Sequence, residues 1–429
     1  MNIEQTTLPS GLRVVTANLP GFDSAAVAAF VDTGSRNEGA AENGIAHFLE
    51  HMAFKGTTGR SALDIAREIE TLGSNINAYT SQGITAYFVT GLGVNIEKSV
   101  AIIGDVLTAS VFNEAEIATE KGVILQEISR SHDSPNSLAY NSFGPTAYPD
   151  QALGRSILGQ PEFIRAVTRD NFTSFVERFY VASNMIVVGT GDIGHAAFVA
   201  MVAQYFAALP SGRDAPPEQA ARWGGGYTPA PDGKFEQVTA LIGWDSVAEV
   251  DTRVHAHRML SSAIGGGMSS PLFQEVREKR GLVYAVSGSH DSGQDYGEFL
   301  LYAGTTPDKL DEVVRVACGV FQNAARSVGS DDLERARNRE LVAYATIKEK
   351  PFSLARYLAS TLFEHGRIIE PDESKRLIEA VTMADLGDAA AMIFASHPTV
   401  ALVGPVPETD YLGLIAAELG VGRREAALV

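Results

Sequence analysis

The sequence has almost no cysteine, since Cys318 is the only one among 429 residues. A single thiol excludes an internal disulfide, and it excludes a cluster of thiolates that would hold a metal. Cys318 lies in the apolar stretch 314–320, where a buried structural thiol is expected rather than a nucleophile. The sequence is therefore not that of a disulfide-stapled or cysteine-liganded protein.

Long hydrophobic runs and an excess of positive charge are also missing. No run approaches the roughly 18 apolar residues of a membrane-spanning helix, and residues 1–5 lack the basic and apolar regions of a signal peptide. The 34 Lys and Arg residues stand against 52 Asp and Glu, which gives a net charge of −18. This balance argues against a nucleic-acid or anionic-lipid partner and is compatible with cationic ligands. We expect a cytoplasmic protein that binds neither nucleic acid nor membrane.

Proline and glycine are concentrated in one segment, residues 209–234. Five of the 18 prolines fall there together with the triplet Gly224–Gly226, and the segment has no helical or strand periodicity. Such a stretch is typical of a linker, and a chain of this length is expected to form two domains. The sequence therefore predicts an N-terminal domain at 1–209, a linker at 210–233 and a C-terminal domain at 234–429.

The two halves repeat one order of elements, which is strand, strand and helix. The repeats are predicted at 73–80, 85–90 and 95–110 and again at 281–286, 298–302 and 307–324. Strands in small groups separated by helical pairs favour an α+β fold over a doubly wound sheet. We predict two homologous α/β-sandwich-like halves that arose by duplication, each a mostly antiparallel sheet covered by helices.

The most informative segment is an apolar stretch at residues 45–54 whose only polar side chains are His47, Glu50 and His51. A helix this apolar is expected to be buried, and its three polar residues share one face because they lie at i, i+3 and i+4. Two imidazoles one turn apart can bind a common zinc ion, and Glu50 is placed to take a proton from a zinc-bound water. The competing interpretation is a pair of core histidines satisfied by neighbours.

A catalytic zinc needs a third protein ligand, and a second predicted helix offers two candidates. The apolar stripe of residues 113–131 also contains Glu120 and Glu127. Carboxylates on a buried face are costly unless a metal and its histidines compensate them. One glutamate is therefore expected as the third ligand and the other as a carboxylate that orients a histidine. Spacing alone does not choose between them, and a helix whose acids only skirt the core is the alternative.

The segment His47-Phe48-Leu49-Glu50-His51, followed by Phe54-Lys55-Gly56-Thr57, resembles the signature of the pitrilysin/insulinase family of inverted-motif zinc peptidases. The chain is most similar to the short bacterial members that are like mitochondrial processing peptidase. In that family the third zinc ligand is a glutamate far downstream, and Glu127 stands 76 residues after His51. The resemblance thus implies that Glu127 is the ligand and that Glu120 matches a second glutamate that assists the site.

Two further pairs match the family outside its signature. Asn77 and Ala78 resemble the edge strand against which the substrate peptide lies as an added strand. Arg277 and Tyr284 resemble a pair that reaches from the C-terminal half to the substrate backbone and helps to stabilise the oxyanion. Without the resemblance, Arg277 would be read as a solvated helix residue and Tyr284 as a core aromatic.

The resemblance implies a zinc endopeptidase with one Zn²⁺ per chain that cleaves unfolded or short peptides. Family members of this length work as dimers that enclose a chamber, and a homodimer suffices here because one chain carries both the zinc motif and the Arg277/Tyr284 pair. The acidic balance favours basic peptides as substrates. The competing hypothesis is a non-catalytic structural or peptide-binding subunit of the same fold, since some family members lose part of the motif.

Overall fold

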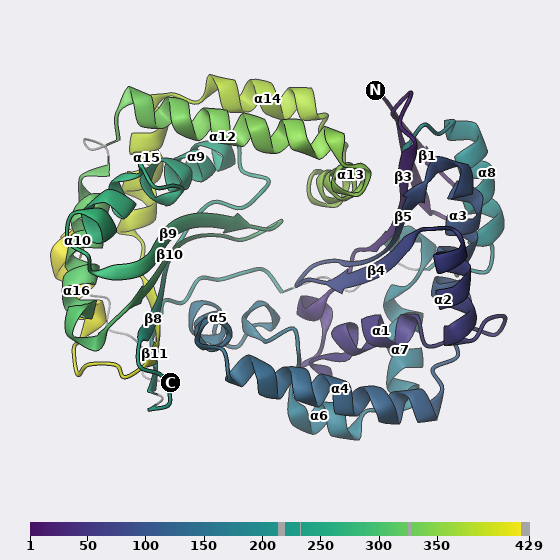
Figure 1. The fold of residues 1–429 in the computed structure, drawn as a ribbon, viewed down its shortest axis with the longest axis horizontal. Helices are drawn as coiled ribbons and strands as arrows, with labels where there is room; N and C mark the ends of the chain where they lie inside the picture. Colours follow the sequence, from purple (N-terminus) through teal and green to yellow (C-terminus); the bar gives the residue numbers. More distant parts are fainter. Residues whose placement is uncertain (213–218, 232, 325–327, 422–429) are drawn as a thin grey trace. The chain divides into compact units, whose positions relative to one another are not determined.

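Two β-sheets organise the chain, and each forms the centre of a separate compact unit (Figure 1). The computed structural model describes residues 1–212, 219–231, 233–324 and 328–421. Unit 1 comprises Met1–Ser129, Arg155–Gln219 and Ala345–Ile369. Unit 2 comprises Arg130–Gly154, Ala220–Tyr344 and Glu370–Val429.

The sheet of unit 1 has six strands in the order β1-β2-β6-β3-β5-β4. In that order they are β1 (Asn2–Thr7), β2 (Arg13–Asn18), β6 (Met185–Gly191), β3 (Ser24–Val31), β5 (Thr85–Leu92) and β4 (Asn75–Thr80). The β2–β6 pair is parallel and the other pairs are antiparallel. Among the described residues, strand β4 pairs with β5 alone and is therefore an edge of the sheet.

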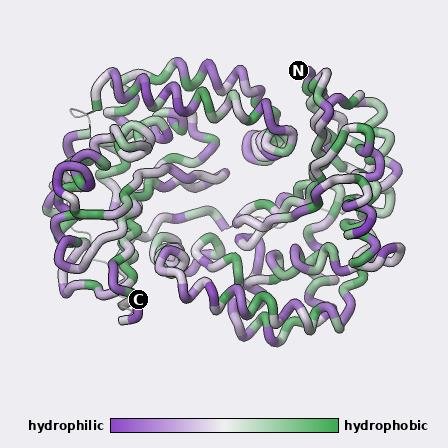
Figure 2. Tube along the Cα trace, viewed as in Figure 1, coloured by the Kyte–Doolittle hydropathy of each residue, from purple (hydrophilic) through white to green (hydrophobic). Residues whose placement is uncertain are grey.

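Seven helices cover one face of this sheet and share one hydrophobic core with it. They are α1 (Ile45–Ala53), α2 (Ala62–Thr71), α3 (Ile96–Ala109), α4 (Glu114–His132), α6 (Pro161–Ala166), α7 (Arg169–Phe179) and α8 (His195–Tyr205). Hydrophobic and hydrophilic residues alternate along α4, as expected for a helix with one face on a core (Figure 2). The opposite face of the sheet packs against α13 (Pro351–His365).

The sheet of unit 2 has five strands in the order β7-β11-β8-β10-β9. They are β7 (Gly226–Pro231), β11 (Thr399–Gly404), β8 (Val238–Asp245), β10 (Gly297–Thr305) and β9 (Val283–Ser292). One face packs against α9 (Val254–Gly265), the π-helical segment η6 (Phe273–Glu278), α10 (Leu310–Gln322), α12 (Ser330–Glu349), α14 (Pro371–Ala380), α15 (Met383–Ala395) and α16 (Tyr411–Leu419). Strand β9 is an edge, and α5 (Pro135–Ala147) covers the other face.

Short 3-10 turns join many of these elements. They are η1 (Ser35–Asn37), η2 (Ala40–Glu42), η3 (Gly93–Asn95), η4 (Ala152–Gly154), η5 (Ala182–Asn184) and η7 (Pro307–Lys309). Cys318 is buried in α10, as the sequence predicts.

The two sheets have the same topology, which confirms the predicted fold of two homologous halves. The order β2-β6-β3-β5-β4 corresponds strand for strand to β7-β11-β8-β10-β9, and the parallel pair occupies the same place in both. Strand β1 is an addition at one edge of the first sheet. Each sheet is mostly antiparallel and covered by helices on both faces.

Each sheet is covered on one face by a helix from the other half of the sequence. The predicted division of the chain at 210–233 does not account for these two helices. Helix α5 precedes residue 210 but packs on the sheet of unit 2, and α13 follows residue 233 but packs on the sheet of unit 1. Both helices present an apolar stripe at i, i+4 and i+8, formed by Ala139, Phe143 and Ala147 in α5 and by Leu354, Leu358 and Leu362 in α13.

The expected linker also contains a strand, although its sequence shows no strand periodicity. Strand β7 spans Gly226–Pro231 and pairs in parallel with β11. Pro229 and Pro231 are tolerated because β7 is an edge strand, where missing N–H groups do not break a ladder on both sides. Residues 213–218 and 232 of the expected linker lie outside the described residues.

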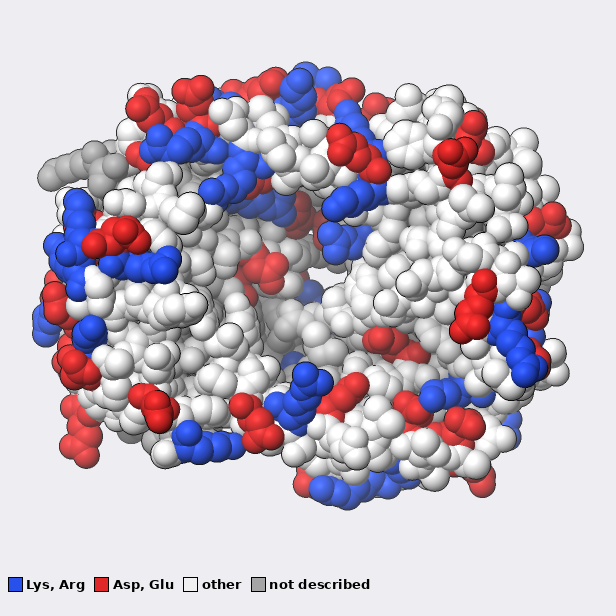
Figure 3. Space-filling model, viewed as in Figure 1, with Lys and Arg blue, Asp and Glu red and all other residues white. Residues whose placement is uncertain are grey.

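Among the helices of the described residues, none is long and apolar enough to cross a membrane. Acidic and basic side chains lie side by side across the face shown in Figure 3.

Candidate active site

Helix α1 carries the two histidines and Glu50, and its local sequence fixes where it begins. Gly44 precedes the helix with a φ of 103°, a left-handed conformation that glycine adopts without strain. A Cβ at Gly44 would also lie 2.7 Å from the Cα of Gly159, so the chain passes too closely there for any other residue. The apolar residues of α1 are buried, while His47, Glu50 and His51 are half-buried on one face.

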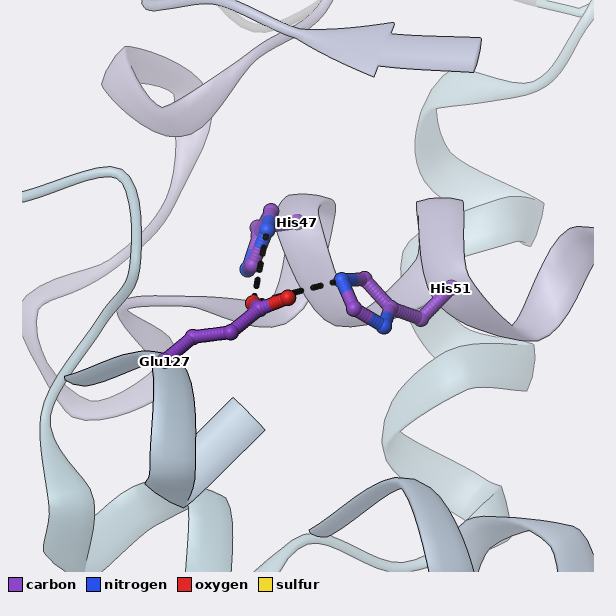
Figure 4. A group of neighbouring side chains, drawn as sticks. All are labelled: His47, His51 and Glu127. Atoms are coloured by element: carbon purple, nitrogen blue, oxygen red, sulfur yellow. Dashed lines mark ion pairs between the residues drawn. The ribbon is translucent and has the colours of Figure 1, made fainter. Parts of the chain in front are cut away.

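The side chains of His47, His51 and Glu127 converge, although Glu127 comes from a different helix, α4 (Figure 4). Oε2 of Glu127 lies 3.7 Å from Nε2 of His47 and 3.5 Å from Nε2 of His51. One ligand atom from each of the three residues lies within 4.8 Å of the others. This is the donor set of a catalytic zinc site, which uses three protein ligands and leaves a position open.

The protonation of the site also suits a metal. Burial, reinforced by the neighbouring His51, lowers the pKa of His47 to about 4. The imidazole of His47 is therefore neutral near pH 7, as a metal ligand has to be. The Glu127 side chain is 40% exposed, which leaves its carboxylate open to solvent. The residues present thus fit a zinc ion.

Glu120 approaches the other nitrogen of His51, and this geometry separates the roles of the two glutamates. Oε2 of Glu120 lies 3.1 Å from Nδ1 of His51, while Nε2 of the same ring faces Glu127. Lys55 holds the second oxygen of Glu120 at 2.5 Å. Although burial opposes the charge, the hydrogen bonds from Lys55 and His51 lower the pKa of Glu120. Glu120 is therefore placed to orient His51, and Glu127 is placed to bind the metal.

Glu50 is held on the side of α1 that faces strand β4. The hydroxyl of Thr80 donates a hydrogen bond of 2.7 Å to Oε2 of Glu50. Burial raises the pKa of Glu50, and the Thr80 hydroxyl partly offsets this effect. A half-buried carboxylate with a raised pKa suits a general base that works near neutral pH.

Glu38 caps the N-terminus of α1, a role that was not predicted from the sequence. Its carboxylate is 3% exposed and accepts hydrogen bonds from the backbone N–H groups of Gly44 and Ala46 and from Nδ2 of Asn43. Burial raises the pKa of Glu38 to about 7, against the lowering effect of these bonds. An acidic side chain six residues before a glycine carries no local signal, because its contact with the helix depends on the path of the loop between them.

Asn77 and Ala78 lie on β4, the edge strand of the first sheet. The Ala78 N–H does not point into the ladder, because it donates to Oδ1 of its neighbour Asn77 at 2.8 Å. Asn77 is exposed, and Ala78 packs against the core that also contains α1. The edge thus offers an outward N–H that an added strand could use.

Arg277 and Tyr284 lie side by side in unit 2. The guanidinium carbon of Arg277 is 6.0 Å from the centre of the Tyr284 ring and 4.8 Å from that of Phe273. Tyr284 is on the edge strand β9 and is 80% exposed, so it is not a core aromatic. Their predicted contact with a substrate stays a prediction.

Fold and site together present a histidine–carboxylate cluster that could hold a metal ion, with both histidines on helix α1 and the glutamate on α4. The family profile described as Insulinase (Peptidase family M16) matches residues 13–161, and the profile described as Peptidase M16 inactive domain matches residues 166–340. An uncharacterized zinc protease of Rickettsia felis is 35% identical over 405 residues, 94% of this chain and 98% of that protein. An uncharacterized zinc protease of Streptomyces coelicolor is 32% identical over 414 residues, 95% of this chain and 90% of that protein.

The chain therefore belongs to the insulinase family of peptidases, M16. The fold is also that of a solved protease from Helicobacter pylori, with a TM-score of 0.87 at 24% identity over 94% of this chain and 99% of that one. A solved chain from Pseudomonas fluorescens described as a peptidase M16 inactive domain has a TM-score of 0.87 at 20% identity, over 95% and 98% of the two chains.

Proposed function

We propose that this protein is a zinc-dependent endopeptidase that hydrolyses peptide bonds in unfolded or short peptides. The observation that carries the proposal is the convergence of His47, His51 and Glu127, with Glu50 on the same face of α1 as both histidines. The names of the relatives in Rickettsia and Streptomyces support the zinc chemistry.

Different residues of the chain bind the metal, orient a ligand and transfer the proton during peptide hydrolysis. His47, His51 and Glu127 hold the metal, and Glu120 keeps the ring of His51 in the orientation that presents Nε2. When bound, zinc supplies Lewis acidity that polarises the scissile carbonyl and makes water more acidic. Glu50 takes the proton of the attacking water at its carboxylate and passes it to the nitrogen of the departing amine, so that the peptide bond breaks without leaving an amide anion.

The substrate binds as an extended strand along β4. Main-chain hydrogen bonds to an edge strand hold a peptide without reading its sequence, which suits a peptidase of broad specificity. The N–H of Ala78, now held by Asn77, is the donor that the peptide takes over. Arg277 and Tyr284 contribute donors to the peptide backbone and to the oxyanion. The net charge of −18 favours basic peptides.

The proposed assembly is a homodimer that encloses a chamber and so limits the size of the substrate. One chain carries both the metal-binding residues and the Arg277/Tyr284 pair, so a second, different subunit is not required. Sedimentation of the purified protein tests this, because a stable monomer that is fully active would contradict the dimer.

Cleavage of a mixed pool of unstructured peptides, with mass spectrometry of the products, tests the proposed function. The wild type should cut the pool, a chelator should stop the cutting, and added zinc should restore it. His51→Ala serves as the matched variant, and it should contain no zinc and cut nothing. A zinc-loaded wild type that cuts no peptide would favour the non-catalytic structural or peptide-binding subunit instead.

A further inference from the structure

The hydrogen bond between Thr80 and Glu50 joins the edge strand to the general base. Thr80 is the last residue of β4, and its hydroxyl lies 2.7 Å from Oε2 of Glu50. The alternative acceptor, the carbonyl oxygen of Ala46, is 3.5 Å away, at the limit of a hydrogen bond. The hydroxyl proton therefore points to the carboxylate.

The alternation of side chains along β4 explains why Thr80 can reach Glu50. Ile76 and Ala78 pack against the core that contains α1, and Thr80 follows them at the same two-residue period. Asn77 and Tyr79 point to the other face, where Tyr79 packs against the core formed with α13. Position 80 therefore faces α1, and its hydroxyl meets Glu50 there.

We propose that Thr80 is a positioning residue for the general base. Its hydroxyl donates to Oε2 of Glu50 and its backbone N–H supports the same carboxylate, so that Glu50 is aligned to take the proton from the attacking water. The inference rests on the proposed function. It adds that β4 has two functions. The strand offers the N–H of Ala78 to the peptide, and two residues further on its Thr80 holds the carboxylate of Glu50.

Three variants of the zinc-loaded protein test this role. Thr80→Val keeps the shape of the side chain and removes the hydroxyl, and Thr80→Ser keeps the hydroxyl. Thr90→Val on the neighbouring strand β5 is the matched control, since it makes the same change away from Glu50. Loss of one hydrogen bond to a charged group predicts that Thr80→Val lowers kcat at least about tenfold. KM and zinc content should stay near the wild-type values, and Thr80→Ser should recover most of the rate.

Crystal structures of the same variants give a readout that does not depend on activity. In Thr80→Val the Glu50 carboxylate keeps only the backbone contact to residue 80 and should rotate away from the orientation that it has in the wild type and in Thr80→Ser. Wild-type kcat in Thr80→Val, or a loss of rate that follows a loss of zinc, would overturn the proposal. An unchanged Glu50 in the Thr80→Val crystal would overturn it too. Should the wild type cleave no peptide, the proposed function fails, and the crystals still decide the role of Thr80.

Discussion

Oε2 of Glu120 lies 3.1 Å from Nδ1 of His51. A carboxylate behind a metal-binding imidazole fixes the tautomer and the ring orientation and makes the opposite nitrogen a stronger ligand. Lys55, 2.5 Å from the other oxygen of Glu120, helps to keep this carboxylate charged. Metal affinity should therefore depend on a residue that does not touch the metal.

Glu120→Gln should weaken zinc binding by about 10- to 100-fold while the fully loaded protein still holds one zinc. Competition with a chromophoric chelator measures the affinity. Glu114→Gln, an exposed change in the first turn of the same helix, is the control and should bind zinc like the wild type. An unchanged zinc affinity in Glu120→Gln would mean that this contact does not orient His51.

Glu127→Gln should lose more zinc affinity than Glu120→Gln, because it replaces a charged ligand by a neutral amide. The zinc content after dialysis against a weak chelator distinguishes the two variants. The reverse order, with Glu120→Gln empty and Glu127→Gln loaded, would show that the roles of the two glutamates are exchanged.

Glu38 should make the stability of the metal-free protein depend on pH. Burial raises its pKa from 4.5 to about 7 in the folded chain. Between these values the unfolded chain releases the proton that the folded chain keeps, so the free energy of unfolding falls as the pH rises. Above about 7 the folded chain is ionised too, and this contribution stops changing.

Glu38→Gln should remove this part of the pH dependence, since an amide does not titrate. Urea unfolding at a series of pH values across the same interval measures the slope, with the exposed Glu114→Gln as the control that keeps it. An identical slope in Glu38→Gln and in the wild type would show that Glu38 does not carry the proton.

Tyr284→Phe should lower kcat/KM for peptides and leave the zinc content and the thermal stability unchanged. The reason is that Tyr284 is 80% exposed, so its hydroxyl is available to a substrate and supports little of the fold. Tyr140→Phe makes the same change at another exposed tyrosine and should have no effect. Equal kinetics in the two variants would remove Tyr284 from the proposed substrate contacts.

The sequence predicted the parts of the site that depend on local geometry. The spacing of His47, Glu50 and His51 places them on one helix face whatever surrounds the helix. It could not choose between Glu120 and Glu127, because residues seven apart lie on the same stripe of a helix. The choice depends on which nitrogen of His51 each carboxylate meets, and this is a property of the packing of α4 against α1.

The features that the sequence missed all depend on contacts between distant segments. Thr80 and Glu38 act on α1 through a strand and a loop, so neither has a local pattern. Helices α5 and α13 have clear apolar stripes, but a stripe does not say which of two sheets it will cover. Strand β7 was not predicted because it contains two prolines. Proline is not tolerated in a central strand, but it is tolerated in an edge strand such as β7.

In the proposed mechanism Glu50 moves the proton of the attacking water and is not a ligand of the metal. Purified wild-type protein and Glu50→Gln should be compared for zinc per chain and for cleavage of one peptide mixture. We predict that both proteins hold the same amount of zinc and that Glu50→Gln loses cleavage by at least about 100-fold. Wild-type cleavage by zinc-loaded Glu50→Gln, or the loss of zinc together with activity, would contradict the account.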